Sequence, residues 1–242
     1  GSVTAVDLSR RPFLITGEAR EMTADTLIIA TGASANWLDL PSVRRFENKG
    51  ISACATCDGF FFRGKKIAVV GGGDSAVEEA TFLTRFGTEV HLLVRRDVLR
   101  ASKIMQERAK SHPKLRLRWN TEIEEALGDE TLNALRLRNN ATGETTTEAF
   151  GGLFMAIGHT PNSAFLAGQL PTNPKGYLLT MPGRAATRIP GVFACGDVVD
   201  NYYRQAVTAA GTGCAAAIEA ERFLETGEMP EPPMTYAGAP VH

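Results

Sequence analysis

The chain has 242 residues, a length that allows one large domain or two modest ones at roughly 150 residues per domain. Its 26 lysines and arginines nearly balance its 27 aspartates and glutamates, which argues against a nucleic-acid binder. The hydrophobic share of 43% and the charged share of 22% are typical of globular proteins. No apolar run reaches the roughly 18 residues of a membrane span, and the first residues do not form a secretory signal. We therefore expect a soluble, cytoplasmic protein that binds neither nucleic acid nor membranes.

Short apolar runs alternate with helical patterns along the chain, which is typical of an α/β fold. The run at 26–30 shows no alternation and predicts a strand buried on both faces. Gly87 follows a helical pattern and is expected to cap that helix. The segment 163–190 has little periodicity, and the Pro-rich tail after Gly227 predicts an irregular terminus. Strands are expected at 26–30, 66–70, 90–94, 115–119 and 192–195, helices at 75–86, 102–110 and 205–224, and an antiparallel hairpin at 132–138 and 145–150.

An internal echo links the two halves of the chain. Leu27–Gly32 (LIIATG) and Leu153–Gly158 (LFMAIG) have the same pattern, and the second copy follows a glycine-rich turn at 71–73. The same spacing places the turn of the first copy before residue 1. We therefore expect a duplicated dinucleotide-binding architecture in which the first phosphate-binding turn lies outside this chain.

The segment Gly71–Ala76 (GGGDSA) fits the pattern G-x-G-x-x-A between a predicted strand and a predicted helix. In such turns the glycines permit a tight turn and close approach of the backbone to a pyrophosphate, which the helix N-terminus attracts. Gly71, Gly73, Asp74 and Ser75 are therefore candidate cofactor-binding residues. A glycine-rich turn without a ligand is the alternative.

Arg95 and Arg96 follow the second strand of this unit, and Arg100 lies just beyond. An acidic residue at this point would hold a ribose hydroxyl, whereas guanidinium groups suit a 2′-phosphate. The arginines therefore favour NADPH over NADH. A solvated surface pair is the alternative interpretation.

The segment Cys54–Asp58 (CATCD) contains a C-x-x-C pair, whose spacing permits a small disulfide ring that opens and closes by thiolate exchange. A structural zinc site needs four ligands, and no second cysteine or histidine pair lies nearby, so we expect no metal. An inert cysteine pair is the alternative. Cys195 and Cys214 are expected to be buried free thiols.

A hydride donor and a disulfide usually exchange electrons through a flavin. Asp197, with Gly196 at a strand end, is a candidate for binding ribityl hydroxyls, and the helix that opens at Arg204–Ala206 (RQA) is a candidate for facing the flavin. Thr31 and Gly32, at the end of the first strand, join these candidates. His159 after Gly158 is either a cofactor contact or a polar cap.

Together these motifs resemble those of the low-molecular-weight, bacterial-type thioredoxin reductases. The resemblance covers about residues 6–228 in the order of the family. The motifs that carry it are Ala53–Phe60 (ACATCDGF), Gly71–Ala76, Arg95-Arg96 with Arg100, Ala156–His159 (AIGH), Gly196-Asp197 and Tyr203–Ala206 (YRQA).

The resemblance implies two Rossmann-like dinucleotide-binding domains, each with three layers around a mostly parallel sheet and an antiparallel meander. An NADPH domain at 38–162 would be inserted in a partial FAD domain made of 1–37 and 163–242, and the two would rotate about hinges near residues 38 and 162. Ile157, Gly158 and His159 would contact NADPH, and the protein would be a homodimer.

The resemblance also implies that electrons pass from NADPH to FAD, then to the Cys54–Cys57 disulfide, then to thioredoxin. Cys57 would face the flavin, Cys54 would attack thioredoxin, and Asp58 would serve as acid and base.

Two departures from the family pattern are visible. The family has histidine where this chain has Val94, and the first glycine motif of the family precedes Val3. The sequence therefore predicts an N-terminally truncated reductase that holds little FAD. A catalytically impaired NADPH-binding fragment and a related flavin-dependent dithiol oxidase are the alternatives, although the oxidase would have no need of Arg95 and Arg96.

Overall fold

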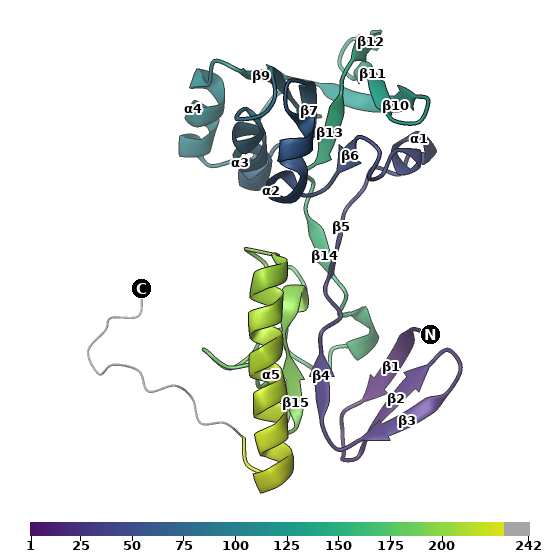
Figure 1. The fold of residues 1–242 in the computed structure, drawn as a ribbon, viewed down its shortest axis with the longest axis vertical. Coiled ribbons are helices and arrows are strands. Elements are labelled where there is room, and N and C mark those ends of the chain that lie inside the picture. Colours follow the sequence, from purple (N-terminus) through teal and green to yellow (C-terminus); the bar gives the residue numbers. More distant parts are fainter. Residues whose placement is uncertain (230–242) are drawn as a thin grey trace, which may run out of the picture. The chain divides into compact units, whose positions relative to one another are not determined.

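The computed structural model describes residues 1–229. The chain folds into two compact units (Figure 1). Unit 1 consists of Gly1–Ser34 and Thr160–His242, and unit 2 is Ala35–His159. The chain passes between the units twice, at β5 (Ala33–Ala35) and β14 (His159–Pro161), which pair with each other. The predicted irregular tail lies outside the described residues from position 230 onward.

Unit 2 contains a five-stranded parallel sheet in the order β6-β13-β7-β8-β9. Its central strands are short runs of apolar residues because helices and a second sheet cover both faces. On one face, buried side chains of α3 such as Ala76 and Ala80 pack against Val69 and Leu92. The elements are β6 (Ile51–Ser52), β7 (Lys66–Val70), β8 (Glu89–Leu93), β9 (Leu115–Arg118), β13 (Gly152–Met155), α1 (Pro41–Arg45), α2 (Ala55–Asp58), η1 (Gly59–Phe62), α3 (Asp74–Leu83) and α4 (Lys103–Ser111).

A three-stranded antiparallel sheet packs against the other face of the parallel sheet in unit 2. It consists of β10 (Thr121–Gly128), β11 (Leu132–Asn139) and β12 (Thr145–Ala149). The predicted hairpin is confirmed as β11 and β12. Strand β10 was not predicted, and it begins where the chain leaves the edge of the parallel sheet.

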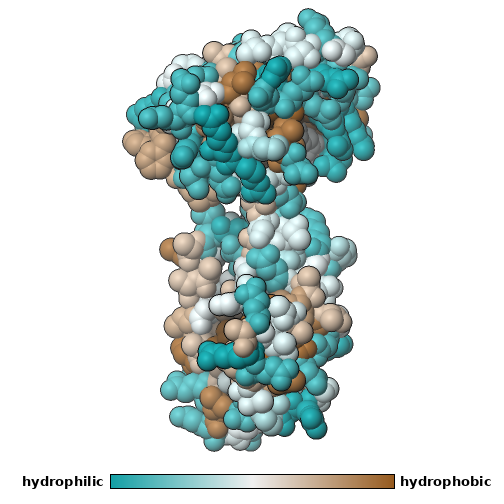
Figure 2. Space-filling view, turned by 90° about the vertical axis from the view of Figure 1, so that its right-hand side faces the viewer, coloured by the Kyte–Doolittle hydropathy of each residue, from teal (hydrophilic) through white to brown (hydrophobic). Residues whose placement is uncertain are grey.

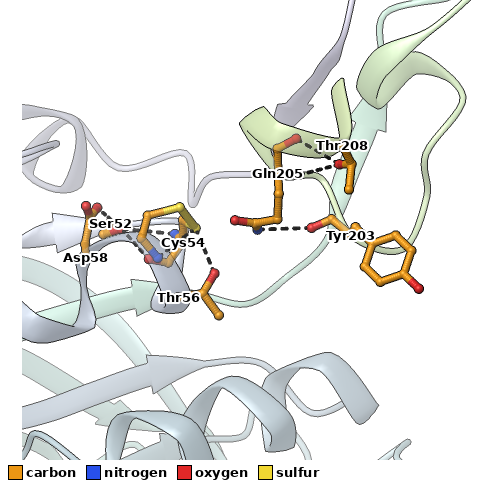
Figure 3. The surroundings of a disulfide bond; sticks show 8 residues. Ser52, Cys54, Thr56, Asp58, Tyr203, Gln205 and Thr208 are labelled. Atoms are coloured by element: carbon orange, nitrogen blue, oxygen red, sulfur yellow. Dashed lines mark hydrogen bonds between the residues drawn. A yellow bond between two sulfur atoms is a disulfide. The ribbon is translucent and has the colours of Figure 1, made fainter. Parts of the chain in front are cut away.

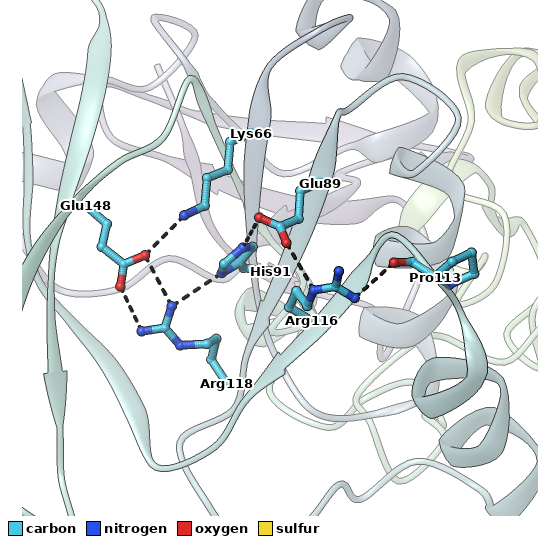
Figure 4. A network of polar contacts seen from close by, with 7 residues as sticks. All are labelled: Lys66, Glu89, His91, Pro113, Arg116, Arg118 and Glu148. Atoms are coloured by element: carbon cyan, nitrogen blue, oxygen red, sulfur yellow. Dashed lines mark hydrogen bonds and ion pairs between the residues drawn. The ribbon is translucent and has the colours of Figure 1, made fainter.

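A network of charged side chains connects this second sheet to the parallel one (Figure 4). Arg118 holds Glu148 of β12 through two hydrogen bonds, of 2.8 and 3.2 Å, and Lys66 lies 3.1 Å from the same carboxylate. His91 is buried between Arg118 and Glu89, with its Nε2 2.8 Å from the Glu89 carboxylate. The network therefore ties three strands of the parallel sheet to β12.

Unit 1 holds a three-stranded antiparallel sheet and a separate parallel pair of strands. Phe13, Ile15 and Val192 are among the side chains of its core. The antiparallel sheet was not predicted. Its elements are β1 (Val3–Asp7), β2 (Phe13–Gly17), β3 (Glu21–Ala24), β4 (Leu27–Ile29), η2 (Ala164–Leu166), β15 (Val192–Ala194), η3 (Gly196–Val198) and α5 (Ala206–Thr226).

Three local predictions were wrong. Strand β4 is not buried on both faces, because it pairs with β15 alone among the described strands and leaves Ile28 39% exposed. Gly87 does not cap α3, which ends at Leu83, and the glycine is needed instead because an added Cβ would lie 2.9 Å from Cδ1 of Ile67. Cys195 is buried as expected, but Cys214 is exposed on α5.

Within residues 1–229, no helix has the length and apolar character required to cross a membrane. Figure 2 shows polar residues over much of the visible surface, with apolar residues scattered among them. The most exposed large apolar side chain is Val207, at 82% exposure on α5, followed by Ile104 on α4.

Candidate functional site

Cys54 and Cys57 form a disulfide bond at the start of α2 (Figure 3). Cys54 occupies the N-cap position, and its Sγ accepts a hydrogen bond from the backbone N–H of Cys57 at 3.2 Å. Cys54 is half-buried, whereas Cys57 and the intervening Thr56 are exposed. The expectation of a small disulfide ring is therefore confirmed, and the ring lies at the surface of unit 2.

A buried serine that the sequence did not single out lies behind this ring. The Ser52 hydroxyl is 2.6 Å from Oδ2 of Asp58 and accepts the backbone N–H of Cys54 at 3.0 Å. Ser52 itself is 5% exposed. Asp58, the candidate acid and base, is therefore fixed beside the disulfide by a hydrogen bond that water does not readily displace.

The glycine-rich turn connects the end of β7 to α3, as predicted. An alanine at Gly71 would place its Cβ 2.5 Å from the carbonyl oxygen of Ala156 and 2.6 Å from Cβ of Ala76. Gly73 is the N-cap of α3, and a Cβ added there would meet no atom within 4 Å. The first glycine therefore serves close packing, and the third leaves open space in front of a helix N-terminus, where an anion is favoured.

The two residues after the turn differ from each other in their surroundings. Oδ1 of Asp74 accepts hydrogen bonds from the backbone N–H and the hydroxyl of Ser102, at 2.8 and 2.9 Å. That carboxylate therefore positions the start of α4. Ser75 is exposed on the first turn of α3.

The arginine loop after β8 is fixed by its backbone. The N–H of Asn120 donates to the carbonyl of Arg96 at 3.1 Å, and the side-chain amide of Asn140 donates to the carbonyl of Arg95 at 2.7 Å. The N–H of Arg100 donates to the carbonyl of Gly72 at 2.7 Å, which ties the loop to the glycine-rich turn. Three exposed guanidinium groups are thereby held beside that turn.

A cavity of about 500 Å³ lies between the turn, the arginine loop and the start of β10, entirely within unit 2. It brings together five of the predicted coenzyme-binding residues, namely Gly71, Arg95, Arg96, Arg100 and Ile157. Val94, which stands where the family has histidine, also lines it. Gly73, Asp74, Ser75, Gly158 and His159 are not among its lining residues. The lining consists of Leu38–Leu40, Val70–Gly72, Leu93–Arg96, Val98, Arg100, Thr121–Ile123 and Ile157.

Gly158 lies just past this cavity, at the passage between the units. Its φ of +94° is in the region that favours glycine, and its carbonyl accepts the backbone N–H of Asn36 at 2.9 Å. His159 follows as the first residue of β14 and is half-buried. Gly158 therefore shapes the crossing of the chain.

In unit 1, four of the predicted flavin-binding residues follow the ends of β4 and β15, and the other three lie at the start of α5. The hydroxyl of Thr31 donates to the carbonyl of Asn162 at 2.7 Å, and the carbonyl of Gly32 accepts the N–H of Asn162 at 2.9 Å. The backbone N–H of Gly196 donates to the hydroxyl of Thr212 at 3.0 Å. These bonds fix both turns.

Asp197 is half-buried, and one of its carboxylate oxygens is fully enclosed. Its Oδ1 is buried and accepts no hydrogen bond from the described residues. An unpaired buried carboxylate oxygen is costly unless a ligand or water supplies a donor. The side chain therefore fits a ligand with hydroxyl groups, as the ribityl chain of a flavin has.

Asp200, which was not predicted from the sequence, organises the loop before α5. Its carboxylate accepts the backbone N–H groups of Tyr202, Tyr203 and Arg204 at 2.8, 2.9 and 3.0 Å. Burial alone would raise the pKa of Asp200, but these hydrogen bonds outweigh it and the pKa is lowered. The carboxylate thus stabilises Arg204 in its left-handed conformation, with a φ of +48°.

The helix that follows begins with a reciprocal capping arrangement (Figure 3). Gln205 is the N-cap of α5, and its backbone N–H donates to the hydroxyl of Thr208 at 3.3 Å. Ala206 is the first helical residue and is exposed. The predicted YRQA segment is therefore a rigid entry into α5.

The chain was compared with known proteins. The family model of pyridine nucleotide-disulphide oxidoreductases matches residues 1–213. Thioredoxin reductase of Dictyostelium discoideum is 50% identical over 230 residues, which are 93% of this chain and 72% of the relative. Thioredoxin reductase 1 of Saccharomyces cerevisiae is 51% identical over 234 residues, which are 94% of this chain and 73% of the relative. The chain belongs to the thioredoxin reductase family.

A solved thioredoxin reductase, from Giardia duodenalis, supports the same assignment. It aligns with a TM-score of 0.86 at 42% identity and covers 93% of this chain and 74% of its own. The α/β fold class and the resemblance to thioredoxin reductases are therefore confirmed. Within residues 1–229, no group of three or more His, Cys, Asp or Glu side chains is arranged to hold a metal ion.

Proposed function

We propose that the chain reduces the disulfide of thioredoxin, with electrons that pass from NADPH through FAD to the Cys54–Cys57 pair. The observation that carries this proposal is the presence in one unit of a formed C-x-x-C disulfide and a cationic cavity at a glycine-rich turn. The thioredoxin reductases at about 50% identity support it. We further propose that the protein is a cytoplasmic homodimer with an NADPH domain at 38–162 and a partial FAD domain at 1–37 and 163–242.

The cavity in unit 2 would hold NADPH. The open space at Gly73 and the N-terminus of α3 suit the pyrophosphate, because backbone N–H groups at a helix start favour an anion. Arg95, Arg96 and Arg100 suit the 2′-phosphate, because guanidinium groups make charge-assisted hydrogen bonds to phosphate oxygens. Ile157 lines the same cavity and would contact the coenzyme, and we retain Gly158 and His159 as neighbours of the nicotinamide.

Unit 1 would supply part of an FAD site. The unpaired Oδ1 of Asp197 fits the ribityl hydroxyls, and the turns at Thr31-Gly32 and Gly196, with the Arg204–Ala206 entry into α5, form its surroundings. When bound, FAD supplies the carrier that couples hydride transfer from a nicotinamide to reduction of a disulfide.

The reduced cysteine pair then performs the exchange with thioredoxin. The Cys54 thiolate attacks one sulfur of the thioredoxin disulfide, whose S–S bond breaks as a mixed disulfide forms and a thioredoxin thiolate leaves. Cys57 next attacks Sγ of Cys54, which re-forms the ring and releases the second thioredoxin thiol. Two electrons and two protons pass to thioredoxin, and Asp58, positioned by Ser52, is the group that moves a proton at this site.

The surface beside the disulfide favours a protein substrate. Phe60 and Phe61 follow the C-x-x-C turn and are 61% and 71% exposed. Their rings lie edge to face at 6.1 Å, and the guanidinium of Arg63 lies 5.0 Å from the ring centre of Phe60. Exposed aromatic and arginine side chains are enriched where proteins bind each other. A small disulfide would have no use for them.

The test is NADPH oxidation coupled to the appearance of thioredoxin thiols, with added FAD. We expect activity in the wild-type chain and in Cys214→Ser, and none in Cys54→Ser. Cys214 is a matched control because it is an exposed free cysteine outside the redox pair.

Two outcomes would contradict the proposal. Oxygen consumption without thioredoxin reduction would favour a flavin-dependent dithiol oxidase. NADPH binding without turnover in any of the three proteins would favour a coenzyme-binding fragment.

A further inference from the structure

An acidic side chain lies among the arginines of the coenzyme cavity. Oε1 of Glu122 is 3.9 Å from Nε of Arg95, and both residues line the cavity. The side chain of Arg95 is 72% exposed and that of Glu122 is 43% exposed, so each is within reach of a bound ligand. A negatively charged ligand in this cavity would therefore compete with the Glu122 carboxylate for Arg95.

Backbone hydrogen bonds hold the two segments that carry these side chains next to each other. The N–H of Thr121 donates to the carbonyl of Val94 at 3.0 Å, and the next residue along each segment is Glu122 or Arg95. A second bond joins the N–H of Asn120 to the carbonyl of Arg96 at 3.1 Å. The two side chains therefore project from adjoining segments.

We propose that Glu122 limits the preference of this site for NADPH over NADH, an inference that rests on the proposed function. A phosphate monoester carries between one and two negative charges near neutral pH. Its attraction to Arg95 is weakened by a carboxylate that already occupies that guanidinium. The unphosphorylated ribose of NADH is neutral there, and acidic residues accept hydrogen bonds from ribose hydroxyls in NAD sites. Glu122 therefore lowers the affinity of the site for NADPH and does not lower its affinity for NADH.

The size of the penalty follows from the repulsion between the carboxylate and the phosphate. For exposed groups about 8 Å apart, with an effective dielectric between that of a protein surface and that of bulk water, one such charge changes a binding constant by about three- to thirtyfold. Salt at high concentration reduces this effect, because both groups are exposed to solvent. A surface ion pair with only a structural role would leave coenzyme binding unchanged.

The test is calorimetric titration of NADP⁺ and NAD⁺ into the wild-type chain, Glu122→Gln and Glu124→Gln. Glu124 is the matched control because it lies on the same strand and is 3.9 Å from Arg138, but it does not line the cavity. We expect Glu122→Gln to bind NADP⁺ about three- to thirtyfold more tightly, with NAD⁺ unchanged or weaker. Glu124→Gln should match wild type, and high salt should reduce the gain.

A second variant tests the route through Arg95. In an Arg95→Ala background, Glu122→Gln should give a smaller gain in NADP⁺ affinity, because the competition for Arg95 is gone and only the repulsion between the carboxylate and the phosphate remains. Equal NADP⁺ affinity in wild type and Glu122→Gln, with matching thermal unfolding, would overturn the inference. So would an equal gain for both coenzymes. If neither coenzyme bound the wild-type chain, the proposed function would fall and the inference with it.

Discussion

The hydroxyl of Ser52 lies 2.6 Å from Oδ2 of Asp58, on the strand that leads into the redox turn. The Ser52 hydroxyl oxygen also accepts the backbone N–H of Cys54 at 3.0 Å. One hydroxyl, 5% exposed, therefore joins the candidate acid to the first cysteine of the disulfide. This arrangement fixes the carboxylate relative to the ring before any substrate arrives.

We expect Ser52→Ala to destabilise the oxidised protein by about 1–3 kcal/mol, because the half-buried carboxylate of Asp58 and the half-buried N–H of Cys54 both lose a partner. The reduced variant should also exchange more slowly with oxidised thioredoxin. Denaturant titration and exchange kinetics measure the two effects, with the exposed Ser111→Ala as control. Unchanged stability together with an unchanged rate would show that the hydroxyl does not position Asp58.

Two glycines of one turn should respond differently to alanine. In Gly71→Ala the new Cβ collides with the carbonyl of Ala156, so we expect lower stability and lost NADPH binding together. In Gly73→Ala the Cβ enters open space, and we expect normal thermal unfolding with weaker NADPH binding, because that space faces the α3 N-terminus. Full NADPH affinity in a folded Gly73→Ala would place the pyrophosphate elsewhere.

The strand, turn and helix from 66 to 94 were predictable because their signals are local. The apolar run of β7, the glycines at 71–73 and the apolar spacing of α3 each constrain a few neighbouring residues. The end of α3 was less predictable, since the chain leaves the helix at Thr84 to bring Gly87 against Ile67. That contact is tertiary and leaves no mark in the helical pattern.

The antiparallel strands of unit 1 were missed for a different reason. Strand β1 buries only Val6, and the face of β3 is largely exposed, so neither has the alternation that marks a half-buried strand. Ser52 and Glu122 acquire their roles only when the fold brings them to Asp58 and Arg95. Asp200 left a usable signal, because an aspartate before a helix often accepts backbone N–H groups in a turn.

The arginine pair should discriminate between coenzymes. We expect Arg95→Ala with Arg96→Ala to weaken NADPH binding at least tenfold and NADH binding little, because only NADPH carries the phosphate that guanidinium groups bind. Titration with both coenzymes measures the difference. The matched control is Arg63→Ala, an arginine of the same unit that does not line the cavity. Equal losses for NADPH and NADH would remove the assignment of the 2′-phosphate to these side chains.

The half-buried ion pairs of Glu148 with Arg118 and Lys66 predict a stability that depends on pH. Hydrogen bonding to Arg118, assisted by Lys66, lowers the pKa of Glu148 from 4.5 to about 2. A lowered pKa means that the carboxylate stabilises the fold above pH 4.5 and that this contribution is lost as the pH falls toward 2. We expect Glu148→Gln to cost about 1–2 kcal/mol at neutral pH, after allowance for solvent screening.

Denaturant titration at neutral pH and at a pH between those two values measures this dependence. The difference between wild type and Glu148→Gln should shrink in acid. Glu144→Gln is the control, since Glu144 forms no ion pair within the part of the chain that the structure describes. A difference that persisted unchanged in acid would mean that the Glu148 charge is not the source of the stability.

The most direct test of the central claim is to trap the intermediate between Cys54 and thioredoxin. The chain with Cys57→Ser and Cys214→Ser would be mixed with a thioredoxin that retains one redox cysteine, activated as a disulfide with thionitrobenzoate. Attack by Cys54 should release one thionitrobenzoate and leave a one-to-one covalent adduct that maps to Cys54. Far less adduct should form when Cys54→Ser replaces Cys57→Ser. No adduct through Cys54, or an equal yield from both variants, would contradict the account.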